Sequence, residues 1–167
     1  MSTLEDQRLL DVLDDAECRR LLGRAVIGRL AYTENALPTI QPVHFIVHAG
    51  RVLIPTRVGS KVEAASRGAI VAFEVDDFDD GARTGWNVTV IGAADVVTDP
   101  ARVAELDALG ARPWAPADVP CYIAVDTTVV RGRRLTAGRP ETGRPEPGTD
   151  DPSETGPETL VGPAARS

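Results

Sequence analysis

The sequence contains only one lysine, Lys61, among 18 basic residues, so the remaining 18 minus one, or 17, are arginines. Acidic residues number 25, which gives a net charge of -7. The arginines are scattered, and aromatic residues make up only 4% of the chain. Nucleic-acid-binding proteins gather positive charge on one face, so this composition argues against a nucleic-acid partner.

Cysteine and histidine are equally scarce. Cys18 and Cys121 lie far apart and form no Cys-x-x-Cys pair, so neither a zinc site nor a redox dithiol is indicated. The two histidines, His44 and His48, fall in one apparent strand, where four residues of extended chain separate them by about 13 Å. One metal ion could not bind both, and no metal site is predicted.

Long apolar runs are also missing. No stretch approaches the roughly 18 apolar residues that a membrane-spanning helix needs. The first ten residues, MSTLEDQRLL, lack the basic-then-apolar order of a secretion signal. We therefore expect a cytoplasmic protein without a membrane partner, and 43% hydrophobic residues suffice for one domain with a core.

The composition changes sharply near the C-terminal end. Residues 136–167 contain six prolines, five glycines, six acidic residues and three arginines, with few apolar side chains to bury. Such a segment cannot offset the entropy lost on ordering. The sequence thus predicts an ordered domain over residues 1–135 and a disordered tail over residues 136–167.

Within the ordered part, the patterns predict strands joined mostly by tight turns. Helices are expected at 15–22, capped by Asp14, and from Pro100 to about Leu109. The acidic run 76–81 is expected to be a solvated turn. Strands are expected at 25–32, 39–47, 51–56, 70–76, 86–97 and 122–135. Six short strands with one apolar face each are best buried in a small barrel, which is a mainly β fold with peripheral helices.

The surroundings of the lone lysine suggest an anion site. Ser60 and Glu63 have capping-box spacing, so a short helix over 61–67 would place Lys61 in its first turn. A cation there is unfavourable by about 0.3 to 1 kcal/mol because the helix dipole is positive at that end. Arg57 adds to this repulsion. A bound phosphate would reverse its sign, whereas the alternative is that both side chains simply point into water.

Five segments, taken in order, resemble a known family. They are VIGRLAY, PTIQPVHF, LIPTRVGSK, AFEVDD and GWNVTVIGAADVV. Together they resemble the pyridoxamine 5'-phosphate oxidase-like proteins, which are FMN-binding split barrels, and the resemblance runs from Leu13 to Leu135. It implies a six-stranded split β-barrel that forms a homodimer with FMN at the subunit interface.

The resemblance also implies which residues bind the flavin. Those expected to hold its phosphate are Thr56, Arg57, Ser60 and Lys61. Those expected to run along its ring are Gln41, Pro42, Val43 and His44. Trp86 and Asn87 are expected to contact the ring from another strand. Two alternatives stay open, namely that Val43 is an ordinary core residue and that Trp86 is an aromatic side chain of the dimer core.

The C-terminal region departs from the family pattern. True pyridoxamine phosphate oxidases end in a motif of arginine, glutamate, phenylalanine and tryptophan, whereas here RGRRL leads directly into the tail. That activity is not expected. The favoured hypothesis is an FMN-dependent oxidoreductase of a small substrate, with no catalytic residue assigned. The alternatives are a deazaflavin-dependent reductase on the same fold and a non-catalytic flavin or haem carrier.

Overall fold

The computed structural model describes residues 10–57, 59, 62, 68–110 and 121–136. Apart from Val62, the predicted helix at 61–67 lies outside these residues, and so does the tail from residue 137 onward. The described part contains two helices, α1 (Asp15–Leu22) and α3 (Pro100–Ala108). Its strands are β1 (Leu10–Leu13), β2 (Ile27–Glu34), β3 (Leu37–His44), β4 (Ile46–His48), β5 (Arg51–Thr56), β6 (Ile70–Asp79), β7 (Thr84–Val97), β8 (Cys121–Asp126) and β9 (Val129–Leu135).

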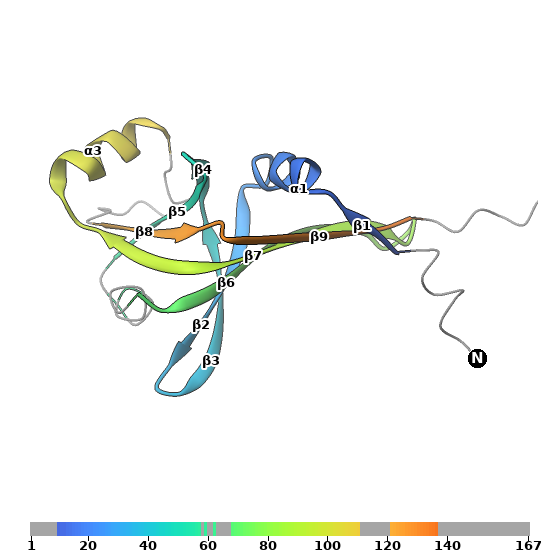
Figure 1. Ribbon diagram of the computed structural model, residues 1–167, viewed down its shortest axis with the longest axis horizontal. Coiled ribbons are helices and arrows are strands. Elements are labelled where there is room, and N and C mark those ends of the chain that lie inside the picture. Colours follow the sequence, from blue (N-terminus) through green and yellow to red (C-terminus); the bar gives the residue numbers. More distant parts are fainter. Residues whose placement is uncertain (1–9, 58, 60–61, 63–67, 111–120, 137–167) are drawn as a thin grey trace, which may run out of the picture.

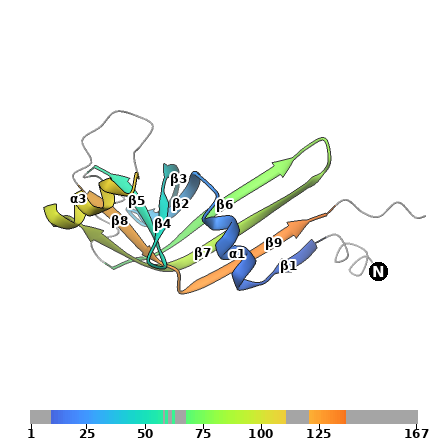
Figure 2. The same cartoon turned by 90° about the horizontal axis from the view of Figure 1, so that it is seen from above.

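All the strands belong to one antiparallel sheet with the order β3-β2-β6-β7-β8-β5-β4. Two further strands extend the sheet from β7: β9 pairs with β7, and β1 pairs with β9. Helix α1 joins the main core through Leu21 and Leu22, whereas α3 packs through Leu106 against the other face of β8, at Tyr122 and Ala124. Strand β4 appears between the two helices in Figure 1. Figure 2 shows the β6–β7 hairpin, with β9 and β1 beside it, extending away from the rest of the molecule.

The mainly β fold with peripheral helices is confirmed, but the expected count of six strands is wrong because the described part has nine. One cause is a break in the predicted strand 39–47. Phe45 is buried, and its ring packs edge-on against Phe73 with 4.7 Å between ring centroids. Strand β3 therefore ends at His44, and the chain turns into β4, which pairs with β5 instead of β2.

A glycine makes room for this aromatic pair. A Cβ atom added at Gly28 in β2 would lie 2.1 Å from the Phe73 ring, so only glycine fits there. The hydrophobic core surrounds the pair and includes Leu30 from β2 together with Val75 and Val88 from the long hairpin.

The predicted strand 122–135 is also broken, into β8 and β9. Strand β7 pairs with β9 as far as Ile91 and with β8 from Ala94 onward. Gly92 lies between these two regions, and a Cβ atom added there would be 1.8 Å from the carbonyl oxygen of Asp126. The bend between β8 and β9 thus presses against the backbone of β7 at this glycine.

The acidic run also differs from its prediction as a turn. Asp76 to Asp79 continue β6, which makes the β6–β7 hairpin longer than expected, and the turn begins only at Asp80. Asp79 stabilises that turn because its Oδ1 accepts a 2.8 Å hydrogen bond from the N–H of Ala82. Strand β1 was not predicted at all.

The two described helices lie where the sequence predicts them. Asp14 Oδ1 accepts a 2.8 Å hydrogen bond from the N–H of Glu17, which caps α1. Asp99 caps α3 in the same way through the N–H of Arg102 at 2.9 Å. Tyr122 is fully buried under α3, and its hydroxyl donates a 2.5 Å hydrogen bond to Asp107. In the described part, neither helix is long and apolar enough to cross a bilayer.

Glu17 connects α1 to β9 and makes stability depend on pH. Its carboxylate accepts hydrogen bonds from Arg20 at 2.7 and 2.8 Å and from Arg134 at 2.5 Å. The bonds from Arg20, followed by those from Arg134, lower the pKa of Glu17 from 4.5 to about 2. Its contribution to stability is therefore complete above pH 4.5 and is lost as the pH falls toward 2.

We expect Glu17→Gln to lower the free energy of unfolding above pH 4.5, because the amide cannot form the same charged pairs. The difference from the unmodified protein should shrink as the pH falls toward 2. Urea unfolding at a series of pH values measures this. Glu105→Gln, which breaks an exposed pair with Arg102 within α3, is the matched control. A difference for Glu17→Gln that stays constant with pH would contradict the assignment.

Candidate functional site

The residues expected to hold a phosphate begin at the end of β5. Thr56 is buried, with 6% of its surface exposed, and its carbonyl oxygen accepts a 3.5 Å hydrogen bond from the Cys121 thiol. Arg57 follows directly and is exposed. Among the described residues, no acidic side chain forms an ion pair with it. Ser60 and Lys61 lie outside those residues.

The stretch expected along the flavin ring lies on β3, which pairs only with β2 in the described part of the sheet. Its other edge therefore presents backbone groups that a ligand could bind. Val43 points into the core with 7% of its surface exposed, while Gln41 and His44 are half-buried and Pro42 is exposed. An edge strand also tolerates Pro42, since proline has no N–H to donate.

Trp86 and Asn87 lie on opposite faces of β7, because successive strand residues alternate. Trp86 packs against the core and lies beside Asp77 and Arg134 on the neighbouring strands. Asn87 points the other way, and its Nδ2 donates a 2.9 Å hydrogen bond to Glu74. The two side chains therefore cannot contact one ring from the same side.

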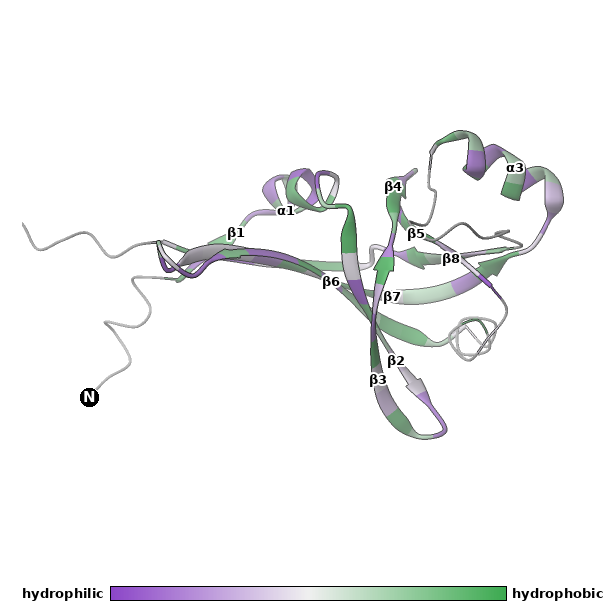
Figure 3. Ribbon diagram, turned by 180° about the vertical axis from the view of Figure 1, so that it is seen from behind, coloured by the Kyte–Doolittle hydropathy of each residue, from purple (hydrophilic) through white to green (hydrophobic). Residues whose placement is uncertain are grey.

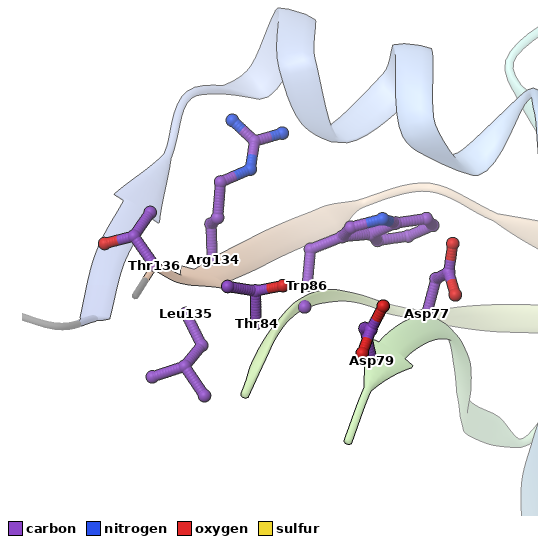
Figure 4. Close-up of a pocket in the computed structure, with 8 residues that line it drawn as sticks. Asp77, Asp79, Thr84, Trp86, Arg134, Leu135 and Thr136 are labelled. Carbon is purple, nitrogen blue, oxygen red and sulfur yellow. The ribbon is translucent and has the colours of Figure 1, made fainter. Parts of the chain in front are cut away.

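Trp86 lines a hollow of about 400 Å³ near the end of the β6–β7 hairpin (Figure 4). Arg134 extends from this hollow toward α1, where its guanidinium pairs with Glu17. The hollow is lined by Asp77, Asp79, Thr84, Gly85, Trp86, Arg134, Leu135 and Thr136. No residue of the β3 stretch is among them, so one copy of the chain does not bring Trp86 and His44 into the same described hollow.

His44 instead lines a second hollow, also of about 400 Å³, which we call the helix-end hollow. It lies where α1 ends and β4 begins. Its lining consists of Leu22, Gly23, Arg24, Ala25, Val26, His44, Phe45, Ile46, Val47, His48 and Leu109. Both histidines contribute to it, which sequence reasoning missed because it treated 39–47 as one straight strand. The described residues contain no group of three or more side chains arranged to hold a metal ion.

The family model for pyridoxamine 5'-phosphate oxidase matches residues 14–137, which includes both helices and all strands except β1. The chain belongs to the pyridoxamine 5'-phosphate oxidase-like family. The resemblance in the five sequence segments is thereby confirmed.

Among its relatives, the uncharacterized protein Rv0080 of Mycobacterium tuberculosis is 41% identical over 130 residues, which are 75% of this chain and 85% of that protein. A solved FAD-binding protein of Mycobacterium smegmatis is 33% identical, with a TM-score of 0.60 over 75% of this chain and 99% of its own. A conserved protein of unknown function from Corynebacterium diphtheriae is 28% identical, with a TM-score of 0.60 over 77% and 99%.

These likenesses confirm the split-barrel fold class. They extend over almost the full length of each solved relative. The five-segment resemblance therefore predicted the family and the fold class correctly.

Proposed function

We propose that this chain is a flavin-binding oxidoreductase that holds FMN and acts on a small substrate. The observation that supports this best is its similarity to a solved FAD-binding protein, at 33% identity over 99% of that protein. The family match over residues 14–137 supports the same proposal. True pyridoxamine phosphate oxidase activity is not part of it, because the C-terminal motif of those enzymes is missing.

Two described residues at the end of β5 support a phosphate site. Arg57 is exposed at the end of β5 without an acidic partner in the described part, and Thr56 precedes it. These residues, with Ser60 and Lys61, would hold the phosphate. Strand β3 contacts β5, the strand that ends at Thr56. The open edge of β3 at Gln41–His44 would therefore face the ring of a flavin whose phosphate is held at the end of β5. When bound, FMN would supply the hydride chemistry, while the chain binds and orients it.

A homodimer is part of the proposal. The strand register aligns an apolar row across five strands on the sheet face opposite α1, consisting of Ile40, Ala31, Ala72, Ile91 and Val129. Ile40 is 67% exposed, and the neighbouring Ile70 is 69% exposed. Isoleucines left this open on a sheet face are suited to burial against a second copy of the same face.

Three measurements on the purified chain test the proposal. We expect a flavin absorption spectrum after incubation with FMN and dialysis, and a mass in sedimentation equilibrium of twice 17.7 kDa. We also expect turnover of reduced nicotinamide or reduced deazaflavin. Stoichiometric flavin without turnover would favour a carrier instead, and a chain that retains no flavin would overturn the proposal.

A further inference from the structure

We infer that the helix-end hollow binds a small apolar molecule that carries a carboxylate. The hollow lies between the end of α1, the start of β2, the bend from β3 to β4, and Leu109 after α3. Figures 1 and 3 show α1 and β4 beside each other. A volume of about 400 Å³ is within the range of small-molecule sites.

About half of the lining of the hollow is apolar. Leu22 and Phe45 form its floor, and both are almost fully buried. Val26, Val47 and Leu109 line it as well, yet they are 49%, 38% and 48% exposed. Three large apolar side chains left open around one hollow would gain free energy if a ligand covered them. The body of the ligand is therefore apolar.

The polar groups of the hollow select a negative charge. Arg24, His44 and His48 line it, and none of the described residues that line it is acidic, although the chain as a whole carries -7. Neither the Arg24 nor the His48 side chain has a hydrogen-bond or ion-pair partner within the described part. A guanidinium and an imidazole that line one hollow suit a carboxylate.

The C-terminal ends of α1 and α3 repel the carboxylate of the ligand only weakly. Helices α1 and α3 both end near the hollow, and a helix C-terminus carries a partial negative charge. However, two of the last four carbonyls of α1 already accept hydrogen bonds, from Gly23 N–H to Arg19 at 3.0 Å and from Arg24 N–H to Leu21 at 3.1 Å. In α3, the Leu109 N–H donates a 3.1 Å hydrogen bond to the carbonyl oxygen of Leu106. The full charge of Arg24 therefore outweighs these capped ends.

His44 connects the hollow to the proposed flavin site. It is the last residue of the β3 stretch expected along the ring, and its side chain lines the hollow. A carboxylate bound in the helix-end hollow would lie beside the proposed flavin, in the position expected of a substrate. This role as a substrate site rests on the proposed function, whereas binding of the carboxylate itself does not.

The two histidines provide a direct measurement, because they are the only ones in the chain. The full chain as purified is titrated with 2-naphthoate, and the imidazole C2 proton signals are followed by NMR. We expect saturable shifts of the histidine signals. The uncharged 2-naphthamide should bind roughly tenfold more weakly or worse, since it cannot form the charge-assisted bonds of the carboxylate.

Variants locate the binding. Arg24→Gln should weaken 2-naphthoate binding roughly tenfold by removing one charged partner, and Val47→Asp should do so by adding a repelling charge. Arg131→Gln, an exposed arginine on β9 that does not line the hollow, is the matched control and should bind normally. The inference is overturned if no saturable shift is seen, if naphthamide binds as well as naphthoate, or if both variants bind normally. FMN binding is measured in a separate titration. A chain that fails to bind FMN would therefore still give an interpretable result with 2-naphthoate.

Discussion

Lys61→Ala is expected to weaken FMN binding roughly ten- to a hundredfold, which corresponds to about 1.4 to 3 kcal/mol. The reason is electrostatic. A cation in the first turn of a helix is repelled by the helix dipole unless an anion binds there. Arg57, which is exposed and has no acidic partner in the described part, would contribute to the same anion site. Fluorescence titration of the purified variant with FMN measures the loss.

Two further variants show whether the charge at this position is what matters. Lys61→Arg keeps the positive charge and should retain most of the affinity. Arg102→Ala removes an exposed positive charge from α3 and should leave FMN binding unchanged. If Lys61→Ala bound FMN as tightly as the unmodified chain, the phosphate assignment would be wrong.

Gly92→Ala is expected to lower the free energy of unfolding by about 3 kcal/mol or more, at the upper end of the cost of overpacking. The added Cβ would lie 1.8 Å from the carbonyl oxygen of Asp126 and 2.8 Å from its carbonyl carbon. Both are backbone atoms, so no rotamer change relieves the clash. Either β7 or the bend between β8 and β9 must move. Thermal unfolding should show a melting temperature lower by about 10 °C.

Gly23→Ala is the matched control for this substitution. Its added Cβ would meet nothing closer than the Arg19 carbonyl oxygen at 3.5 Å, and Gly23 has an ordinary φ of -71°. We expect its stability to change by less than about 0.5 kcal/mol. A Gly92→Ala protein that melts together with Gly23→Ala would show that the packing of β7 against the bend is looser than described.

Elements defined by neighbouring residues could be predicted from the sequence. Helix α1 follows from Asp14 and Glu17, whose capping contact is present as expected. Helix α3 follows from Asp99 and Pro100 for the same local reason. The β2–β3 hairpin also forms, with its turn at Asn35 and Ala36 at positive φ. In each case the residues that decide the structure lie within a few positions of one another.

The breaks in the strands could not be predicted, because they depend on residues far away in the sequence. The break at Phe45 requires the ring of Phe73, and the break after Asp126 requires the backbone of Gly92. Strand β1 pairs only with β9, at the other end of the domain. Local preference for a strand says nothing about such contacts.

The same limit applies to the candidate site. Its residues are an expectation from the family resemblance, but the opposite orientation of Trp86 and Asn87 follows from the register of β7 with its neighbours. The helix-end hollow depends on the bend at Phe45, which brings His48 near Arg24 at the end of α1. No pattern in the sequence connects these two residues.

The proposal depends on a flavin held by its phosphate near the end of β5, and a comparison of FMN with riboflavin tests this most directly. The two ligands share the same ring, and only FMN carries the phosphate. We predict that the unmodified chain binds FMN more tightly than riboflavin by roughly tenfold or more, the order lost with one charge-assisted hydrogen bond. Equal dissociation constants for the two ligands, or no binding of either, would contradict the account.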